Sequence, residues 1–392
     1  MRQKKELPIL PGATIGILGS GQLGRMLAIA ASRLGYYVNV YSPEINSPAG
    51  QVAQTETIGN YNDISNIVAF ADSVDVLTFE FENISSAALK EAMKHTLVHP
   101  SAKVLEISQN RHLEKKFLMD SGFPVAPWKP ITNKKEFLQN KFNKDQDSFD
   151  FPAILKTVDL GYDGKGQQRV TNQDQLRIAL NAESANSLVL EQVINFDREL
   201  SVIGARNPQG EKKLFDIFEN QHNSDHILEI THSPAQCTNA LQNKAFKITS
   251  DLMEKLNLVG LICVEFFQKG EELLVNEIAP RPHNSGHLTI EACLTNQFEQ
   301  HIRAICGLPL GNPKIKTPAA MLNILGDSLI KETEPNWESL FSQPHVKLHL
   351  YGKEIAKKGR KMGHLTVLSE TTSVAVEQLL WVKKSLISKE KD

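Results

Sequence analysis

The chain has 392 residues, a formal net charge of −2, 41% apolar residues and 22% charged residues. At roughly 150 residues per domain, this length predicts two or three domains. The ordinary composition excludes collagen-like, mucin-like and wholly disordered chains, and the near-neutral charge gives no general attraction to nucleic acid or a membrane. Four widely separated cysteines without a C-x-x-C pair indicate neither a disulfide framework nor a zinc knuckle.

The N-terminal stretch superficially imitates a secretory signal. An uncharged run at residues 7–24 follows three basic residues, but it contains five glycines and two prolines, which would break a membrane or signal helix. No other stretch reaches the roughly 20 apolar residues that a membrane span needs. We therefore expect a cytoplasmic protein.

A strand–helix–strand pattern opens the chain. An apolar run at residues 14–18 leads into a glycine-rich turn, a helix is expected at 25–34, and β-rich runs follow at 37–41 and 74–79. This order is typical of a parallel, doubly wound α/β sheet. Residues 110–121 then form a charged, helix-compatible stretch.

The first turn reads Gly19-x-Gly21-x-x-Gly24, which lets backbone amides approach a phosphate at a helix N-terminus. A dinucleotide site also needs an acidic residue at the end of the second strand. That strand ends Tyr41-Ser42-Pro43, so an NAD(P)-dependent oxidoreductase is disfavoured. Another phosphorylated ligand and a purely structural turn both stay open.

A second glycine-rich loop, at residues 161–167, follows a strand that carries Lys156. Its amides can fold over a polyphosphate while the lysine supplies positive charge. The chain lacks a G-x-x-x-x-G-K-[ST] loop, so a Walker-type NTPase is not supported. A plain surface hairpin turn remains the alternative.

Two strands at 261–267 and 273–279 form a predicted hairpin around a five-residue turn. If paired residue numbers sum to about 542, Glu265 and Glu277 lie opposite each other and point to one face. Bare carboxylates ~4 Å apart repel by about 4 kcal/mol at an effective dielectric of 20. A cation reverses that sign, and magnesium prefers carboxylates together with nucleotide phosphates. Apolar neighbours disfavour two solvated surface glutamates.

The segment after the hairpin, Arg281-Pro282-His283-Asn284-Ser285-Gly286-His287, is too polar for a core and suits an anion-handling, metal-assisted site. Proline and glycine at 309–318 indicate a linker to a small β-rich C-terminal region. That region holds the densest basic stretch, residues 353–364, which is either a solvated face or a site for a small phosphorylated molecule.

Taken in this order, the motifs resemble those of the ATP-grasp ligases and, among them, the N5-carboxyaminoimidazole ribonucleotide synthase family. The resemblance covers residues 14–366, and Gly-Arg-Lys-Met-Gly-His at 359–364 is a hallmark of that family. It implies an α/β (α+β) ATP-grasp fold. The implied divisions are an N-terminal parallel-sheet domain at 1–109, an ATP-grasp domain at 110–310 with a lid at 122–191, and a small β-rich C-terminal domain at 311–392.

The resemblance also implies an activity. ATP would activate bicarbonate as carboxyphosphate, and aminoimidazole ribonucleotide would take up the carboxyl group, giving N5-carboxyaminoimidazole ribonucleotide, ADP and phosphate in purine biosynthesis. Mg²⁺ or Mn²⁺ is the implied metal, with no nucleic-acid or membrane partner. A homodimer is implied, and the product is expected to pass to a separate mutase.

Site residues follow by matching motif positions. For ATP they are Arg111, Lys156, Gly161, Tyr162, Asp163, Gly164, Lys165, Gly166, Gln167, Glu191, Gln192, Val193, Ile194, Glu199, His222, Asn276 and Glu277. For the metal they are Glu265, Glu277 and Asn284, and for catalysis Arg281, His283 and Lys353. For the ribonucleotide they are Gln22, Glu80, Tyr162, Asp163, Lys353 and Arg360.

Two positions stay open within this resemblance. Lys165 stands where many relatives carry arginine, so the charge is kept but the bidentate fork is lost. Glu80 and Glu82 are expected on one face of a regular strand, so strand alternation does not decide which one contacts substrate. Other ATP-grasp ligases, such as formate-dependent glycinamide ribonucleotide transformylase or biotin carboxylase, and a non-catalytic nucleotide-binding protein remain alternative functions.

Overall fold

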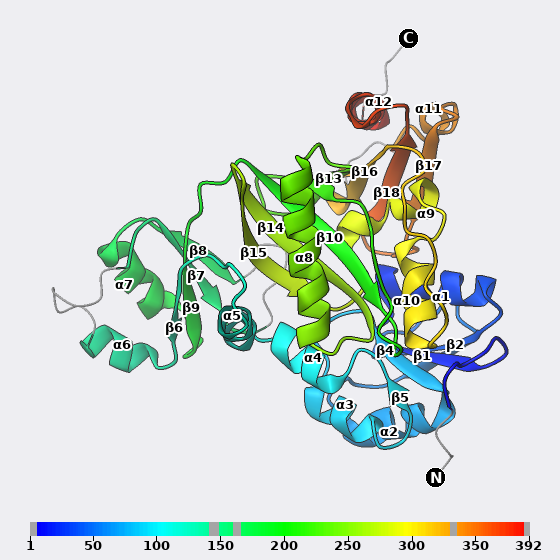
Figure 1. Cartoon of the computed structure of the whole chain (residues 1–392), viewed down its shortest axis with the longest axis horizontal. Helices are drawn as coiled ribbons and strands as arrows, with labels where there is room; N and C mark the ends of the chain where they lie inside the picture. The colour runs from blue at the N-terminus through cyan, green and yellow to red at the C-terminus, as the bar shows by residue number, and fades with distance from the viewer. Residues whose placement is uncertain (1–5, 141–148, 160–165, 330–334, 388–392) are drawn as a thin grey trace.

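The computed structural model describes residues 6–140, 149–159, 166–329 and 335–387. Figure 1 shows an N-terminal α/β unit, a small lid unit standing apart on one side, and a large central sheet to which the C-terminal strands are added. Within the described ranges, no helix combines the length and apolar character needed to cross a bilayer.

The N-terminal unit is the predicted parallel sheet. Its strands run in the order β3-β2-β1-β4-β5, and every pair is parallel. The strands are β1 (Thr14–Leu18), β2 (Tyr37–Ser42), β3 (Thr55–Ile58), β4 (Val76–Phe79) and β5 (Leu97–Val98), and the helices are α1 (Gln22–Arg33), α2 (Ile64–Ser73), α3 (Ser86–Ala92) and α4 (Ala102–Ser108). Helix α1 begins three residues earlier than expected, directly after Gly21, which serves as its N-cap.

Helix α5 (Arg111–Asp120) leads into the lid unit. The lid is an antiparallel four-stranded sheet in the order β6-β9-β7-β8. Its elements are β6 (Trp128–Ile131), α6 (Lys134–Asn140), β7 (Ala153–Thr157), β8 (Gln167–Val170), α7 (Gln173–Ala182) and β9 (Leu188–Gln192). Lys156 therefore lies near the end of β7, as the sequence predicts.

The central sheet has nine strands, in the order β15-β14-β10-β12-β13-β16-β18-β17, with β11 added to β10. Its strands are β10 (Arg198–Arg206), β11 (Lys212–Leu214), β12 (Phe218–His222), β13 (Leu228–Ser233), β14 (Gly260–Lys269), β15 (Glu272–Ala279), β16 (Ala319–Leu325), β17 (Val346–Leu350) and β18 (Lys361–Leu368). Helix α8 (Asn239–Lys255) covers one face (Figure 1). The turn η1 (Asn284–Gly286) and helices α9 (Thr289–Ala292) and α10 (Gln297–Ile305) follow β15.

The C-terminal region differs from the expected β-rich unit in two ways. Its strands do not form a separate sheet, because β16 pairs with β13 and so continues the central sheet. It also ends in a 16-residue helix, α12 (Thr372–Ile387), which packs against β16 and β18 through Leu379 and other apolar residues. The turn η2 (Gly326–Ser328) and the short α11 (Trp337–Phe341) complete it. The sequence reading missed α12 because its apolar residues are not confined to one narrow stripe.

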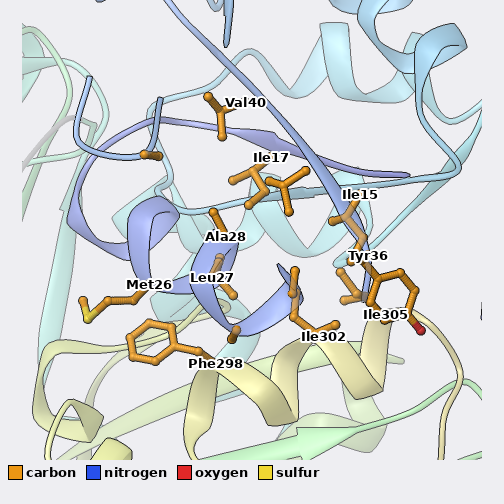
Figure 2. Packing of buried hydrophobic residues seen from close by; sticks show 14 of the residues in the cluster. Ile15, Ile17, Met26, Leu27, Ala28, Tyr36, Val40, Phe298, Ile302 and Ile305 are labelled. Atoms are coloured by element: carbon orange, nitrogen blue, oxygen red, sulfur yellow. The ribbon is translucent and has the colours of Figure 1, made fainter. Parts of the chain in front are cut away.

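A shared hydrophobic core joins the N-terminal unit to the central unit. Figure 2 shows α10 packed against α1, with Phe298 and Ile302 meeting Met26 and Leu27. Each such fully buried side chain contributes about 1.5–3 kcal/mol relative to an exposed one. Because only η1 and the short α9 separate β15 from α10, this core fixes the N-terminal glycine turn relative to the hairpin acids.

Candidate active site

The predicted acid pair is present in the hairpin of β14 and β15. Glu265 lies directly opposite Glu277, and a β-bulge follows Glu265. Burial, and then the neighbouring Glu265, raise the pKa of Glu277. Burial also acts to raise the pKa of Glu265, but contact with His283 and the charges of His222 and Arg281 outweigh it and lower the value to about 2. Glu265 is therefore already paired with His283, whereas the neighbouring cations do not fully compensate the negative charge of Glu277.

The residues around this pair suit a hard divalent cation. Arg111 Nη1 lies 3.7 Å from Glu277 Oε2, so it offers only a long contact to that carboxylate. Both polar atoms of the Asn284 side chain are buried and have no hydrogen-bond partner among the described residues. An amide oxygen and two carboxylates are ligands that Mg²⁺ accepts, so these three side chains fit the metal that the sequence implied.

Three buried charges lie where the lid meets α5. Lys156 Nζ is 2.9 Å and Lys115 Nζ 3.4 Å from Glu191 Oε2, and Lys115 also donates to the Asn276 carbonyl oxygen at 2.9 Å. Burial acts to raise the pKa of Glu191, but the two lysines lower it to about 2. One carboxylate facing two ammonium groups leaves excess positive charge, which a polyphosphate can neutralise.

A second acid–base pair lies on the two strands next to the hairpin, β10 and β12. Glu199 on β10 and His222 on β12 approach to 2.7 Å between Oε2 and Nδ1. Burial lowers the pKa of His222, but the hydrogen bond and charge of Glu199 reverse this and raise it overall. The structure thus brings together two residues that the resemblance assigned independently to ATP. Gln192, Val193 and Ile194 lie half-buried at the end of β9.

The segment after β15 carries two cationic side chains into the same region. Arg281 Nε lies 2.8 Å from Glu82 Oε1, and His283 Nε2 lies 2.9 Å from Glu265 Oε1. Burial opposes the charge on His283, but its contacts with Cys263 and Glu265 raise the pKa. On its other side, His283 Nδ1 lies 2.9 Å from the Ser285 hydroxyl oxygen. His283 is therefore held from both ring nitrogens.

The first glycine turn binds a side chain of the protein itself. The amide nitrogens of Gly21 and Gly24 donate to Glu80 Oε1 and Oε2, each at 2.5 Å. Gly19 has φ of +107°, and a Cβ there would stand 2.3 Å from Glu80 Cγ. These amides are thus occupied by a carboxylate, which further disfavours dinucleotide binding at this turn.

The expectation that Glu80 and Glu82 share one face of a strand is wrong. Strand β4 ends at Phe79, so strand alternation no longer applies to the residues that follow. Glu80 turns toward the N-terminus of α1, and Glu82 turns toward Arg281. Burial raises the pKa of Glu80, with the two amides and the charges of Lys353 and Arg281 acting against it.

The C-terminal basic stretch reaches the same side of the molecule. Gln51 Nε2 donates to the Gly352 carbonyl oxygen at 2.9 Å, and Asn46 Nδ2 donates to Glu354 Oε1 at 3.0 Å. Lys353 donates to the Lys361 carbonyl oxygen at 2.7 Å. Burial, together with the charge of Arg360, lowers the pKa of Lys353 to about 8. Lys353 and Arg360 therefore form a candidate binding site for an anionic group.

Part of the predicted site cannot be placed. Gly161, Tyr162, Asp163, Gly164 and Lys165 lie outside the described residues. The last two residues of the loop, Gly166 and Gln167, are described and exposed. The Gly166 carbonyl oxygen accepts a hydrogen bond from the Thr157 backbone N–H. Gln22 is half-buried at the start of α1, and Asn276 lies on β15 beside Glu277.

Sequence reasoning missed two buried residues of α5. Glu114 Oε1 accepts from the backbone N–H of Ile278 at 2.7 Å, and burial raises its pKa to about 8. Lys115 is the larger omission because it contacts Glu191. The signal was present in the sequence: Arg111, Glu114, Lys115 and Leu118 follow helical i, i+3, i+4, i+7 spacing, and these four form the buried face.

Comparisons with known proteins agree with this geometry. The family model described as "ATP-grasp domain" matches residues 116–298, and the one described as "Ribonucleotide synthetase preATP-grasp domain" matches residues 12–109. A third, "Phosphoribosylaminoimidazole carboxylase C-terminal domain", matches residues 319–378. Together the three models span most of the chain.

Individual relatives are similar over nearly the whole length. An N5-carboxyaminoimidazole ribonucleotide synthase of Bacillus subtilis strain 168 is 42% identical over 372 residues, which is 95% of this chain and 95% of that protein. The crystal structure of an N5-carboxyaminoimidazole ribonucleotide synthetase with ADP superposes with a TM-score of 0.88, at 39% identity, over 98% of this chain and 100% of the other. An Aspergillus clavatus enzyme in complex with ADP and 5-aminoimidazole ribonucleotide gives a TM-score of 0.85, at 30% identity, over 95% and 98%.

Proposed function

Because this chain belongs to the N5-carboxyaminoimidazole ribonucleotide synthase family of ATP-grasp ligases, we propose how its candidate site performs that family's reaction. The chain is a ligase of purine biosynthesis that uses ATP. In our proposal bicarbonate oxygen attacks the γ-phosphorus of ATP, giving carboxyphosphate and ADP. The amine of aminoimidazole ribonucleotide then attacks the carboxyl carbon, phosphate leaves, and the amine proton passes to it.

The ATP site in this proposal lies between the lid and the central sheet. Lys156 and Lys115 face the phosphates, Arg111 stands beside them, the end of β9 receives the adenine, and Glu199 with His222 receives the ribose. Glu265, Glu277 and Asn284 would hold Mg²⁺, which when bound neutralises phosphate charge. The observation that carries this proposal is the facing acid pair, with Arg111 on one side and His283 on the other.

Arg281 and His283 are proposed to handle the reacting anion. Their side chains project from one short segment, and both are half-buried close to the acid pair. Two cationic donors at fixed positions can stabilise the negative charge of carboxyphosphate without reorganising. A water-poor site also protects that reactive species from hydrolysis.

The ribonucleotide is proposed to bind between the N-terminal turn and the C-terminal basic stretch. Lys353 and Arg360 would bind its phosphate, since lysine and arginine both pair with phosphate. Glu80, fixed by the turn amides, would face the aminoimidazole, with Gln22, Tyr162 and Asp163 nearby in the assignment. The α1–α10 core keeps this part of the site aligned with the acid pair.

We propose that the chain acts as a cytoplasmic homodimer, and that a separate mutase consumes its product. We also propose domain divisions at residues 109/110 and 310/311, with the lid at 122–191. Equilibrium sedimentation tests the dimer, and limited proteolysis tests the divisions.

Steady-state ADP release, with each substrate omitted in turn, tests the proposed reaction. We expect turnover only when ATP, bicarbonate and aminoimidazole ribonucleotide are all present. Stimulation by formate with glycinamide ribonucleotide, or by biotin, in place of aminoimidazole ribonucleotide would overturn the substrate assignment. Product analysis by mass spectrometry distinguishes carboxylation from uncoupled ATP hydrolysis.

A further inference from the structure

A cysteine that the proposed reaction does not use lies next to the acid pair. Cys263 precedes Glu265 by two residues on β14, so both side chains point to the same face of the sheet. Its thiol is fully buried and contacts the His283 ring. One ligand atom from each of Cys263, Glu265 and His283 lies within 4.8 Å of the others.

These three ligand types favour a different metal from the one that the acid pair serves. A thiolate and an imidazole suit Zn²⁺, whereas Mg²⁺ prefers oxygen ligands. Zinc–ligand bonds of about 2.0–2.3 Å place tetrahedral ligand atoms about 3.5 Å apart. The observed cluster needs shifts of about 1 Å to reach that geometry. Three protein ligands also leave one tetrahedral position for water.

The local charges permit a divalent cation at this cluster. Glu265 and a deprotonated thiol supply two negative charges, so the bound ion would be neutralised. The neighbouring Arg281 is paired with Glu82 at 2.8 Å, which reduces its repulsion of an incoming cation. His283 already lies 2.9 Å from Glu265, so a zinc ion inserted between them would replace that contact.

We propose that Cys263, Glu265 and His283 form an inhibitory site for a thiophilic divalent cation such as Zn²⁺. Binding releases the thiol proton and the ring proton that faces Glu265, with no change of oxidation state. It removes Glu265 from the magnesium site and His283 from the reacting anion, so inhibition follows even in excess magnesium. The ion binding stands apart from the proposed function, whereas the inhibition rests on it.

The test uses metal-free full-length protein, a phosphine reductant and Co²⁺ as a spectroscopic substitute for Zn²⁺. Cys263→Ala is the test variant, and Cys293→Ala, which removes another buried thiol, is the control. We expect a thiolate-to-cobalt absorption band in the wild type and in Cys293→Ala, and none in Cys263→Ala. In ADP release with excess Mg²⁺, Cys263→Ala should need at least about tenfold more Zn²⁺ for half-inhibition, because the soft ligand is lost.

Each outcome decides a part of the proposal. An equal cobalt spectrum in all three proteins would overturn the site, whether or not the enzyme turns over the expected substrates. A thiolate band with unaltered ADP release in Zn²⁺ would overturn the inhibition. If Cys263→Ala turns over near the wild-type rate without zinc and needs more Zn²⁺ for half-inhibition, as expected, both the site and the inhibition are supported.

Discussion

Ser201→Ala should impair catalysis by breaking a buried hydrogen-bond chain behind His283. The chain runs from Thr231 through Asn220 and Ser201 to Ser285, with links of 3.0, 3.0 and 2.9 Å. Ser285 then contacts His283 Nδ1 at 2.9 Å. All four chain members are buried. Hydroxyls and an amide can reverse their donor direction, so the chain can serve His283 in either protonation state.

The magnitude follows from what the substitution leaves behind. Removing the Ser201 hydroxyl deprives the buried Asn220 amide nitrogen of its acceptor, which costs about 1–3 kcal/mol. It also frees Ser285 from one partner, so His283 is less well oriented. We expect kcat to fall about tenfold, because small displacements of a catalytic group reduce rate strongly. The KM for ATP should stay within about twofold, since Lys156 and Glu199 are untouched.

Urea unfolding, steady-state ADP release across pH and histidine NMR measure these effects. Ser201→Thr, which keeps the hydroxyl, should restore most of the rate. Thr249→Val is the control, because its buried hydroxyl donates to the Ala245 carbonyl oxygen within α8, away from the chain behind His283. If Ser201→Ala and Thr249→Val lose similar stability while both keep the wild-type rate and pH profile, the positioning role of the chain is refuted.

Three further changes test other parts of the site. Glu277→Gln should lower turnover at least about 100-fold, measured by ADP release, while calorimetry should show nucleotide binding only modestly weakened. Glu272→Gln, on the same strand, is the control, and unchanged turnover in Glu277→Gln would remove Glu277 from the metal site. Gly19→Ala should destabilise the fold by about 1–3 kcal/mol and raise the KM for aminoimidazole ribonucleotide, because its Cβ would displace Glu80; Gly122→Ala, also at positive φ but with open space, should leave that KM unchanged. Burial lowers the pKa of His301 to about 3, so the neutral ring is favoured in the folded state. The free energy of unfolding that this residue contributes is complete above pH about 6.5 and falls with pH, by about 2 kcal/mol at pH 5. An equally steep loss of stability with acid in His301→Gln would contradict this.

The hairpin that carries the acid pair could be predicted from its turn and its two apolar runs. Next to the turn, from Lys269–Glu272 to Phe266–Val275, the paired numbers sum to 541, and the bulge between Glu265 and Phe266 shifts the sum to the 542 that places Glu265 opposite Glu277. The parallel N-terminal sheet was equally accessible, since glycine, apolar runs and helix spacing are local signals. The motifs near Arg281 and Lys353 could likewise be read, because unusual polar residues are concentrated there.

Tertiary contacts explain what the sequence did not predict. Lys115 bonds to Asn276, 161 residues further along the chain, and Ser201 bonds to Ser285 across 84 residues. Helical spacing places Lys115 on one face of α5, but nothing local identifies Asn276 as its partner, and nothing local distinguishes Ser201 from other small polar residues. The expectation that Glu80 and Glu82 share one strand face failed for a related reason: β4 ends at Phe79, and the turn amides, rather than strand alternation, decide where the Glu80 carboxylate points. Short polar residues thus become informative only once the fold places them.

A crystal structure with ADP and Mn²⁺ in place of Mg²⁺ tests the central claim most directly. Anomalous scattering locates manganese independently of how the side chains are interpreted. We predict an ion between the carboxylates of Glu265 and Glu277, in contact with the nucleotide's phosphate and close to Asn284. Manganese bound elsewhere, with the two carboxylates turned away from each other and from the nucleotide, would contradict the account.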